Sequence, residues 1–321
     1  MAGGLQILKK RIKSIQSTRQ VTKAMEAVSA SKMRKAVAKA LASRDYAGLG
    51  WEVVQRLAQS SDVLEHPLFV KREVKASLLI VYTSDRGLCG AMNAQLLRQV
   101  SKWMKVKQSA GVKVKLITIG KKGQNSLRRL GLTLDQTYVS LGDKPSSVAL
   151  RPVASSVMQW FQSGEVDEVV VAYTDFKSSL TQVPTIKTLL PFSAAILETS
   201  GDVVSSGERA HPGASNTLLR ASPLALPPSP ADRNWSEYIF EPGQEGILNT
   251  LIPRLVEVQV FQALLESVAS EQSSRMVAMR NATDAASDMI NDLNLTYNQA
   301  RQAGITQEIA EISAGRLALE N

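Results

Sequence analysis

Hydrophobic residues recur every three or four positions along roughly the last seventy residues of the chain, from about Leu251 to Leu319. The stripe is held over about six seven-residue repeats, which is typical of coiled coils. It runs through Val258, Phe261, Leu265, Val268, Gln272, Arg275, Met279, Ala282, Ala286, Met289, Leu293, Thr296 and Ala300. A helix of this length extends roughly 100 Å. The sequence therefore predicts a long C-terminal helix that needs a partner along this stripe.

A second long helical pattern extends from Leu5 to about Ala58. No proline or glycine interrupts residues 5–47, as a long unbroken helix requires. The stripe keeps helical spacing but slips sideways from a strict heptad, which predicts a weakly supercoiled pairing. Its members are Leu5, Leu8, Ile12, Ile15, Thr18 or Arg19, Val21 or Thr22, Met25, Val28 or Ser29, Met33, Ala36 or Val37, and Ala40 or Leu41.

The polar side of this N-terminal helix is strongly basic. Eleven Lys and Arg residues accompany a single acidic residue, Glu26, over the first 44 positions. Helices that only face water usually interleave acidic residues for support four residues apart. A solvated face is the plain alternative, but the unmatched charge favours contact with something negative. The basic shaft face includes Lys9, Lys10, Lys13, Lys23, Lys32, Arg34 and Lys35.

Between these helices the hydrophobic period changes to that of alternating strands and helices. Strands are predicted at 76–82, 113–119, 132–139 and 167–173, and helices at 91–106, 121–130 and 146–162. Pro184 and Pro191 predict that residues 181–192 form an edge strand or an irregular segment. This alternation indicates a central Rossmann-like α/β domain with a mostly parallel sheet.

The domain boundaries follow from changes in composition. Residues 199–234 hold five of the twelve prolines with many Ser, Gly and Ala residues, which predicts a mobile insertion. Pro253 lies where the long helix either starts or kinks. We therefore expect an N-terminal shaft helix (1–60), a central α/β domain (61–243) and a C-terminal shaft helix (244–321).

Composition and charge bound the class of protein. A chain of 321 residues with 44% hydrophobic and 21% charged residues can bury a sizeable core. The net charge of +9 suggests an acidic partner, a membrane surface or nucleic acid. The single cysteine, Cys89, excludes a disulfide framework and indicates a reducing compartment. No apolar run reaches 18 residues, so no membrane span is expected, and a cytosolic bacterial setting is the simplest interpretation.

The sequence holds no recognised catalytic motif. His66 and His211 form no ligand pattern with each other or with Cys89, so we expect neither metal nor cofactor. The loop 85–90 places glycines between a strand and a helix, where they can cradle a phosphate. Its spacing is incomplete for a dinucleotide site, and a tight structural turn is the favoured interpretation. Cys89 is expected to be a packed residue and not a nucleophile.

Four stretches, in order along nearly the whole chain, resemble the γ subunits of F-type ATP synthases. They are QVTKAMEAVSASKMRKA (20–36), SDRGLCG (84–90), LTQVPT (180–185) and ASEQSSRMVAMRNATD (269–284), the last continued by ARQAGITQE (300–308). The resemblance implies that the terminal helices form an antiparallel shaft inside a ring of alternating α and β subunits. It also implies that the α/β domain is a foot bound to the ε subunit and the membrane c-ring. Proton flow would turn the c-ring and shaft, and ATP would be made or split on β.

The resemblance also assigns contacts to individual positions. Tyr238 and Glu241 resemble foot residues near the c-ring and ε, and the basic shaft face would meet acidic surfaces of β. The insertion departs from the family, because it is longer than in typical bacterial members and lacks the paired cysteines of the chloroplast type. Six positions resemble family contacts with the β subunits: Met25, Glu271, Arg275, Arg301, Gln302 and Thr306.

The expected protein is thus a non-catalytic, torque-transmitting subunit of the central stalk. It would lie on the cytoplasmic face of a bacterial plasma membrane, without inserting into the membrane and without binding nucleic acid. One alternative is a basic coiled-coil nucleic-acid-binding protein, although the chain is short of aromatic residues for base stacking. The other is a nucleotide-binding α/β enzyme, which only the loop 85–90 favours.

Overall fold

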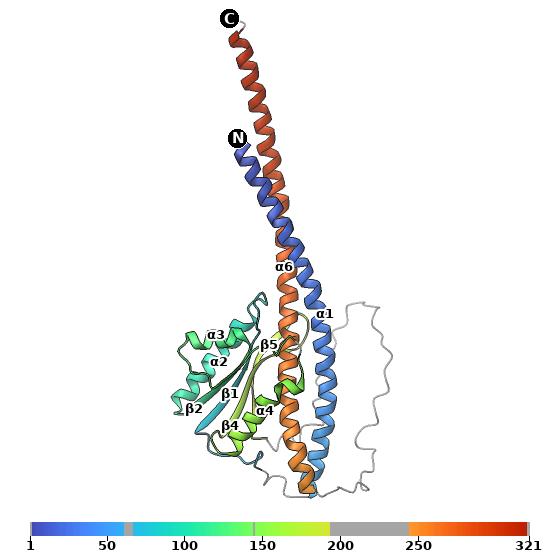
Figure 1. Ribbon diagram of the computed structural model, residues 1–321, viewed down its shortest axis with the longest axis vertical. Helices are drawn as coiled ribbons and strands as arrows, with labels where there is room; N and C mark the ends of the chain where they lie inside the picture. Colours follow the sequence, from blue (N-terminus) through green and yellow to red (C-terminus); the bar gives the residue numbers. More distant parts are fainter. Residues whose placement is uncertain (1, 61–66, 144, 193–243, 320–321) are drawn as a thin grey trace, which may run out of the picture.

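The computed structural model describes residues 2–60, 67–143, 145–192 and 244–319. Two long helices, α1 (Ala2–Ser60) and α6 (Gln244–Leu319), pack side by side in opposite directions. A smaller domain is attached beside the lower half of this pair (Figure 1). Both chain ends lie at the upper end, where α6 projects beyond the start of α1. The two predicted shaft helices are therefore present.

The smaller domain is built on one five-stranded sheet in the order β3-β2-β1-β4-β5. Pairing is parallel except between β4 and β5, which confirms the predicted α/β class with a mostly parallel sheet. The strands are β1 (Ala76–Tyr82), β2 (Lys113–Ile119), β3 (Gln136–Tyr138), β4 (Glu168–Phe176) and β5 (Gln182–Leu190), and the helices are α2 (Met92–Ser109), α3 (Lys121–Arg129) and α4 (Ser147–Gln162).

Alternate residues of each strand enter different cores on the two faces of the sheet. Along β1, Leu78 and Ile80 pack with α4 and α6, whereas Leu79 and Val81 pack with α2 and α3. The strand reads as continuously apolar in sequence because both faces are covered. The sheet therefore separates a shaft-side layer from an outer layer of α2 and α3.

The middle of α6 is buried on almost all sides. Every residue from 263 to 270 is buried, because α6 contacts α1 along one side and β4 and α4 along another. The Tyr82 hydroxyl, at the end of β1, donates a hydrogen bond of 2.9 Å to the carbonyl oxygen of Val260 on α6. Sheet and shaft thus share one core at this level.

A pair of glycines fixes the start of α3 against the end of β1. Gly120 has φ +102°, and a Cβ there would lie 2.1 Å from the carbonyl oxygen of Thr83. The Gly123 N–H donates a 2.8 Å hydrogen bond to the Thr83 hydroxyl. At position 120 only glycine tolerates both the backbone conformation and this close approach.

The structure corrects one predicted boundary and decides between the alternatives left open at two others. The strand expected at 132–139 is reduced to Gln136–Tyr138, because Leu132 and Leu134 pack against the outer core before pairing begins. Residues 181–192 contain the edge strand β5, which pairs only with β4, so the missing N–H of its proline is tolerated. The helix α6 begins at Gln244 and runs through Pro253. The neighbouring Ile252 is fully buried, so the helix stays packed at the position where proline cannot donate a hydrogen bond.

The predicted stripe on α6 is confirmed up to Ala286, and beyond it Leu293 and Ala300 are also half-buried as predicted, but the members between them move by one residue. Ile290 is buried with 7% exposure, whereas the predicted Met289 is 55% exposed. Likewise Thr296 is exposed and Tyr297 is half-buried. An α-helix has about 3.6 residues per turn, so positions three and four residues further along lie on nearly the same side, and the partner surface decides which of the two faces inward.

Four of the five ambiguous pairs on α1 are resolved in favour of the smaller or more polar residue, whereas Thr18 and Arg19 are both exposed. Thr22 and Ser29 are buried, whereas Val21 and Val28 are more than half exposed. The Thr22 hydroxyl shares a 2.7 Å hydrogen bond with the Thr283 hydroxyl on α6. Small side chains at the contact allow the two helix axes to approach closely.

Two expectations concern residues outside the described ranges. The insertion predicted at 199–234 falls there entirely, and so does the boundary placed at residue 243. Among the helices that the structure describes, none combines the length and apolar character needed to cross a membrane.

Candidate functional site at the junction of shaft and sheet

The loop that follows β1 is held in one conformation by its own hydrogen bonds. The Ser84 hydroxyl donates to the carbonyl oxygen of Arg86 at 2.6 Å. Asn93, in the first turn of α2, donates to the Ser84 hydroxyl at 2.7 Å and accepts from the Ser84 N–H at 3.1 Å. Leu88 and Gly90 both have positive φ, which makes the turn tight. The predicted structural turn is therefore present at residues 84–90.

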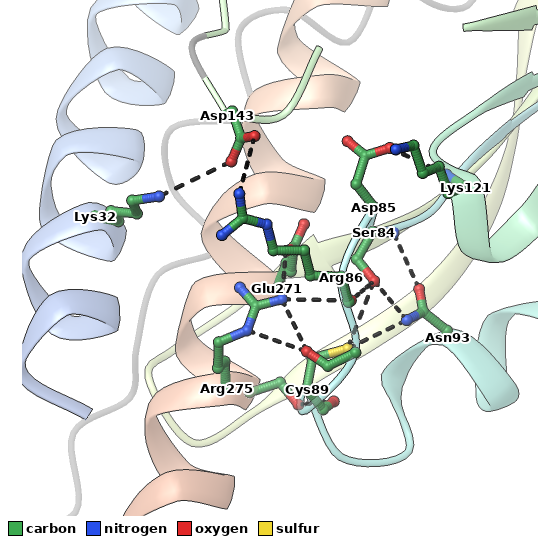
Figure 2. A network of polar contacts seen from close by, with 12 residues as sticks. Lys32, Ser84, Asp85, Arg86, Cys89, Asn93, Lys121, Asp143, Glu271 and Arg275 are labelled. Carbon is green, nitrogen blue, oxygen red and sulfur yellow. Dashed lines mark hydrogen bonds and ion pairs between the residues drawn. The ribbon is translucent and has the colours of Figure 1, made fainter. Parts of the chain in front are cut away.

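Arg275 of α6 fastens this loop to the shaft (Figure 2). Its guanidinium donates to the carbonyl oxygen of Gly87 through Nη2 at 3.1 Å and through Nε at 3.3 Å. It also donates to the carbonyl oxygen of Arg86 at 3.4 Å. One turn away on α6, Glu271 accepts from the same Nη2 at 2.7 Å. These are charge-assisted bonds on a residue with only 7% exposure, so they are stronger than bonds at the surface.

A second tether lies beside the arginine. The Ser274 hydroxyl donates a 2.7 Å hydrogen bond to the carbonyl oxygen of Cys89. Cys89 itself is 2% exposed, which confirms that it is a packed residue. The carbonyl oxygens of Arg86, Gly87 and Cys89 are thus engaged by α6, as a structural turn requires and an open phosphate cradle does not.

Weaker ion pairs connect the junction to α1. Asp143 lies 3.9 Å from the Lys32 ammonium of α1 and 3.9 Å from the guanidinium of Arg86. The Asp143 side chain is about half exposed, so each pair contributes at most about 1 kcal/mol. These ion pairs matter more for position than for stability, because they join α1 to the loop that α6 already holds.

Burial controls the protonation of Glu271. Loss of water raises the pKa of this carboxyl above its usual value, and the carboxylates of Asp85 and Asp143 add to the rise. The Arg275 guanidinium partly opposes the rise. Burial, with a smaller contribution from Tyr173, also raises the pKa of the Tyr82 hydroxyl, which keeps that group neutral as a donor to α6.

A cavity of about 410 Å³ opens where α1, the loop and α6 meet. Met25, half-buried on α1, is one of its lining residues, together with Glu271 and Arg275 of α6. Apolar side chains of α1, including Val21 and Val28, also line it. The junction therefore presents a recess with apolar and charged borders, next to the best-anchored part of the shaft.

The remaining predicted contact residues lie elsewhere. Arg301, Gln302 and Thr306 are exposed near the projecting end of α6, where the Thr306 hydroxyl donates to the carbonyl oxygen of Gln302 at 3.0 Å. Tyr238 and Glu241 lie outside the described residues. The seven residues of the basic shaft face are all exposed: Lys9, Lys10, Lys13, Lys23, Lys32, Arg34 and Lys35.

The junction supports a mechanical role. Over residues 2–60, 67–143, 145–192 and 244–319, no group of three His, Cys, Asp or Glu side chains could hold a metal ion. The polar contacts join three segments, α1, α6 and the loop after β1, into one body. This arrangement can act as a rigid connection between the sheet and the shaft.

Sequence reasoning missed two parts of this joint. Asp143 follows a turn-rich segment with no motif around it, and only its position opposite Lys32 gives it a role. The Thr22–Thr283 bond was hidden because a threonine next to a valine looks like the weaker candidate for an inward position. A usable signal existed for the loop, since Ser, Asp and Asn near glycines are the residues that bond neighbouring backbone.

Comparison with known proteins places the whole chain in one family. The profile of the family described as ATP synthase matches residues 4–319. The ATP synthase gamma chain of Heliobacterium modesticaldum is 40% identical over 98% of this chain and 99% of its own length. That of Chloroflexus aurantiacus is 40% identical over 97% of both chains.

Solved structures show the same fold. A chain in the central stalk and c-ring of the Tetrahymena thermophila mitochondrial ATP synthase matches with a TM-score of 0.56 and 26% identity, over 82% of this chain and 99% of that one. A chain of the Euglena gracilis mitochondrial ATP synthase matches with a TM-score of 0.63 and 18% identity, over 99% of this chain and 95% of that one. The chain therefore belongs to the family of ATP synthase γ chains.

Proposed function

We propose that the protein is the rotor subunit of the central stalk of a proton-translocating ATP synthase, transmitting rotation of the membrane c-ring to the catalytic subunits. It acts by torque and is not itself the catalytic subunit. ATP synthesis and hydrolysis take place on its partners. The relatives described above give no support to the alternative of nucleic-acid binding.

The observation that carries this proposal is the asymmetry of the two-helix shaft. The helix α6 has 76 residues against 59 in α1, which corresponds to about 25 Å of additional helix. Residues 301–313 are exposed apart from half-buried Gly304, and the end of α6 projects past α1 (Figure 1). Lower down, the sheet domain is fastened to the same helix through Arg275 and Ser274. A rigid body with a wide foot and a narrow tip can carry torque from one end to the other.

The finer assignments of partners are part of the proposal. The narrow end is expected to enter a ring of α and β subunits, with Arg301, Gln302 and Thr306 contacting β near the tip. Met25, with the neighbouring Glu271 and Arg275, is expected to face β lower down, at the recess of the junction. The basic shaft face would meet acidic surfaces of β, an attraction that salt weakens.

The foot is expected to bind the ε subunit and the c-ring. Tyr238 and Glu241 are assigned to that contact by their resemblance to the family. The complex is associated with a membrane through its c-ring, and we place this subunit at the cytoplasmic face of a bacterial plasma membrane.

Substitution of Arg301 tests the role of the tip. We expect Arg301→Ala to weaken the coupling between ATP hydrolysis and proton pumping, because a cation that contacts the ring is lost while the buried contacts of the fold remain. Proton pumping and ATP hydrolysis are measured together in membrane vesicles that carry the variant complex. Arg280→Ala, which removes another exposed arginine from the same helix, serves as the matched control.

Two outcomes would contradict these assignments. An unchanged ratio of protons pumped to ATP hydrolysed would remove Arg301 from the contact. Failure of the chain to co-purify with the other subunits of the complex would overturn the proposed function itself.

A further inference from the structure

The outer layer of the sheet domain carries a concentrated positive charge. Residues 86–134 contain eleven Lys and Arg residues and no Asp or Glu, although the chain as a whole holds 29 acidic residues. This segment contains α2, β2 and α3. Its charge therefore exceeds the +9 of the entire chain.

The structure gathers much of this charge on one surface. Arg98, Lys102 and Lys105 lie at helical spacing on α2, on the side opposite its buried residues. The two helices contact each other on the face of the sheet that turns away from the shaft core (Figure 1). On α3, three more cations are exposed opposite the buried Leu127, and they are Lys122, Arg128 and Arg129. We call these six cationic residues the outer basic face.

Nothing within the described part of the chain neutralises the outer basic face. All six side chains are exposed, and none forms an ion pair with a described acidic residue. Nearby lysines behave differently, since Lys107 pairs with Glu168 and Lys115 pairs with Glu165. These two glutamates are therefore already engaged by lysines outside the outer basic face.

This arrangement works against the stability of the isolated helices. Like charges three or four residues apart on a helix repel each other, as Arg98, Lys102 and Lys105 do along α2. A face that only meets water gains nothing from such a pattern. An opposing surface of negative charge offsets the repulsion and speeds association.

The position of the face selects the kind of partner. This step rests on the proposed function, in which the shaft stands upright on a membrane ring. A layer that flanks the shaft then points sideways along the membrane plane, so lipid headgroups do not lie opposite it. A nucleic acid is disfavoured because the single aromatic residue of this segment, Trp103, is half-buried and provides no exposed stacking platform.

Two exposed apolar residues point to a protein surface. Val106 near the end of α2 is 66% exposed, and Leu130 just after α3 is 61% exposed. Apolar residues beside charged ones are typical of protein interfaces, in which a hydrophobic centre is bordered by a polar rim. We propose that the outer basic face binds an Asp- and Glu-rich surface of another polypeptide of the complex, held beside the foot.

Photocrosslinking in the assembled complex tests this proposal. Lys102→p-benzoylphenylalanine places a reactive group at the centre of the cationic stripe on α2, and Ser155→p-benzoylphenylalanine places the same group on exposed α4 as a control. The complex is purified from membranes, irradiated, and its crosslinked peptides are identified by mass spectrometry. We expect the probe at 102, but not at 155, to crosslink to an Asp- and Glu-rich segment of another subunit.

The electrostatic part of the contact is tested in the same preparation. The crosslink at position 102 should fall about tenfold between low and high salt, because screening shortens the range of the attraction. Adding Arg98→Glu and Lys105→Glu should abolish it, whereas Arg98→Lys and Lys105→Arg should preserve it.

The outcomes separate this proposal from the proposed function. Suppose that the chain co-purifies with the complex. The outer basic face is then overturned as a protein-binding surface if the probe at 102 gives no crosslink, if its crosslink does not depend on salt, or if it crosslinks only to lipid or nucleic acid. A chain that does not co-purify with the complex overturns the proposed function first.

Discussion

The lower and upper halves of α6 differ in how many partners cover them. From residue 263 to 270 every side chain is buried, because α1 lies on one side and the sheet domain on the other. Above residue 280 only a stripe along α1 is shielded, and residues 301–313 are exposed apart from Gly304. The same helical pattern therefore yields a structural core in one half and an available surface in the other.

The comparison teaches what the polar residues of α6 do. In the lower half, Arg275 interrupts the apolar stripe, binds the loop after β1 and pairs with Glu271 one turn away. In the upper half, Arg301 and Gln302 are exposed near the tip. A polar residue thus joins two elements where a second layer covers the helix. Where no second layer covers the helix, a polar residue is accessible at the surface.

Removal of the buried arginine should give the largest effect on stability. Arg275→Ala leaves the Glu271 carboxylate buried without its partner and frees the loop after β1, which we expect to cost about 4 kcal/mol. Arg280→Ala, only five residues further along but exposed, should change stability by less than about 0.5 kcal/mol. Denaturant unfolding of both variants measures the difference. Equal unfolding midpoints would show that the junction does not stabilise the foot.

A matched pair of leucines compares the two halves without any change of charge. Leu264 lies in the shared core with 3% exposure, and its replacement by Ala should lower the free energy of unfolding by about 3 kcal/mol. Leu295 lies in the upper half with 61% exposure, and its replacement by Ala should leave the free energy of unfolding almost unchanged. Thermal unfolding of Leu264→Ala and Leu295→Ala provides the measurement. A similar loss in both would mean that the upper half is covered in the free chain as well.

The smallest expected effect concerns pH. Because the folded protein raises the pKa of Glu271, it holds that proton more tightly than the unfolded chain. Stability should therefore fall as pH rises from the ordinary pKa of a glutamate, about 4.3, through the raised pKa of the folded protein. Glu271→Gln keeps an acceptor for Arg275 but cannot ionise, so the fall should disappear. Unfolding curves of the unchanged protein and of Glu271→Gln are measured across this pH range. If stability falls equally with pH in both proteins, Glu271 is not the source of the pH dependence.

Much of the fold could be predicted from sequence because the signals are local. The strands at 76–82 and 113–119 were placed to the residue, since short apolar runs between polar turns leave little choice. The strand at 132–139 was too long because its leucines serve the outer core and not the sheet. The turn at 84–90 was also foreseen, from its glycines and its small polar residues.

The site was less accessible to sequence reasoning. Resemblance to the family singled out Glu271 and Arg275, but nothing along the chain indicates that Arg275 binds the carbonyl oxygens of residues 86 and 87. Those carbonyls belong to every residue type and carry no sequence signal. Asp143 became visible only once its loop lay between α1 and the turn after β1.

The sequence by itself determined two long helices and an α/β domain between them, because helical and strand periodicity are properties of neighbouring residues. The tertiary structure decided which of Met289 and Ile290, or of Val21 and Thr22, faces the partner helix. One turn of helix presents several candidate positions that differ little in local preference. Only the partner surface, which arrives from a distant part of the chain, distinguishes between them.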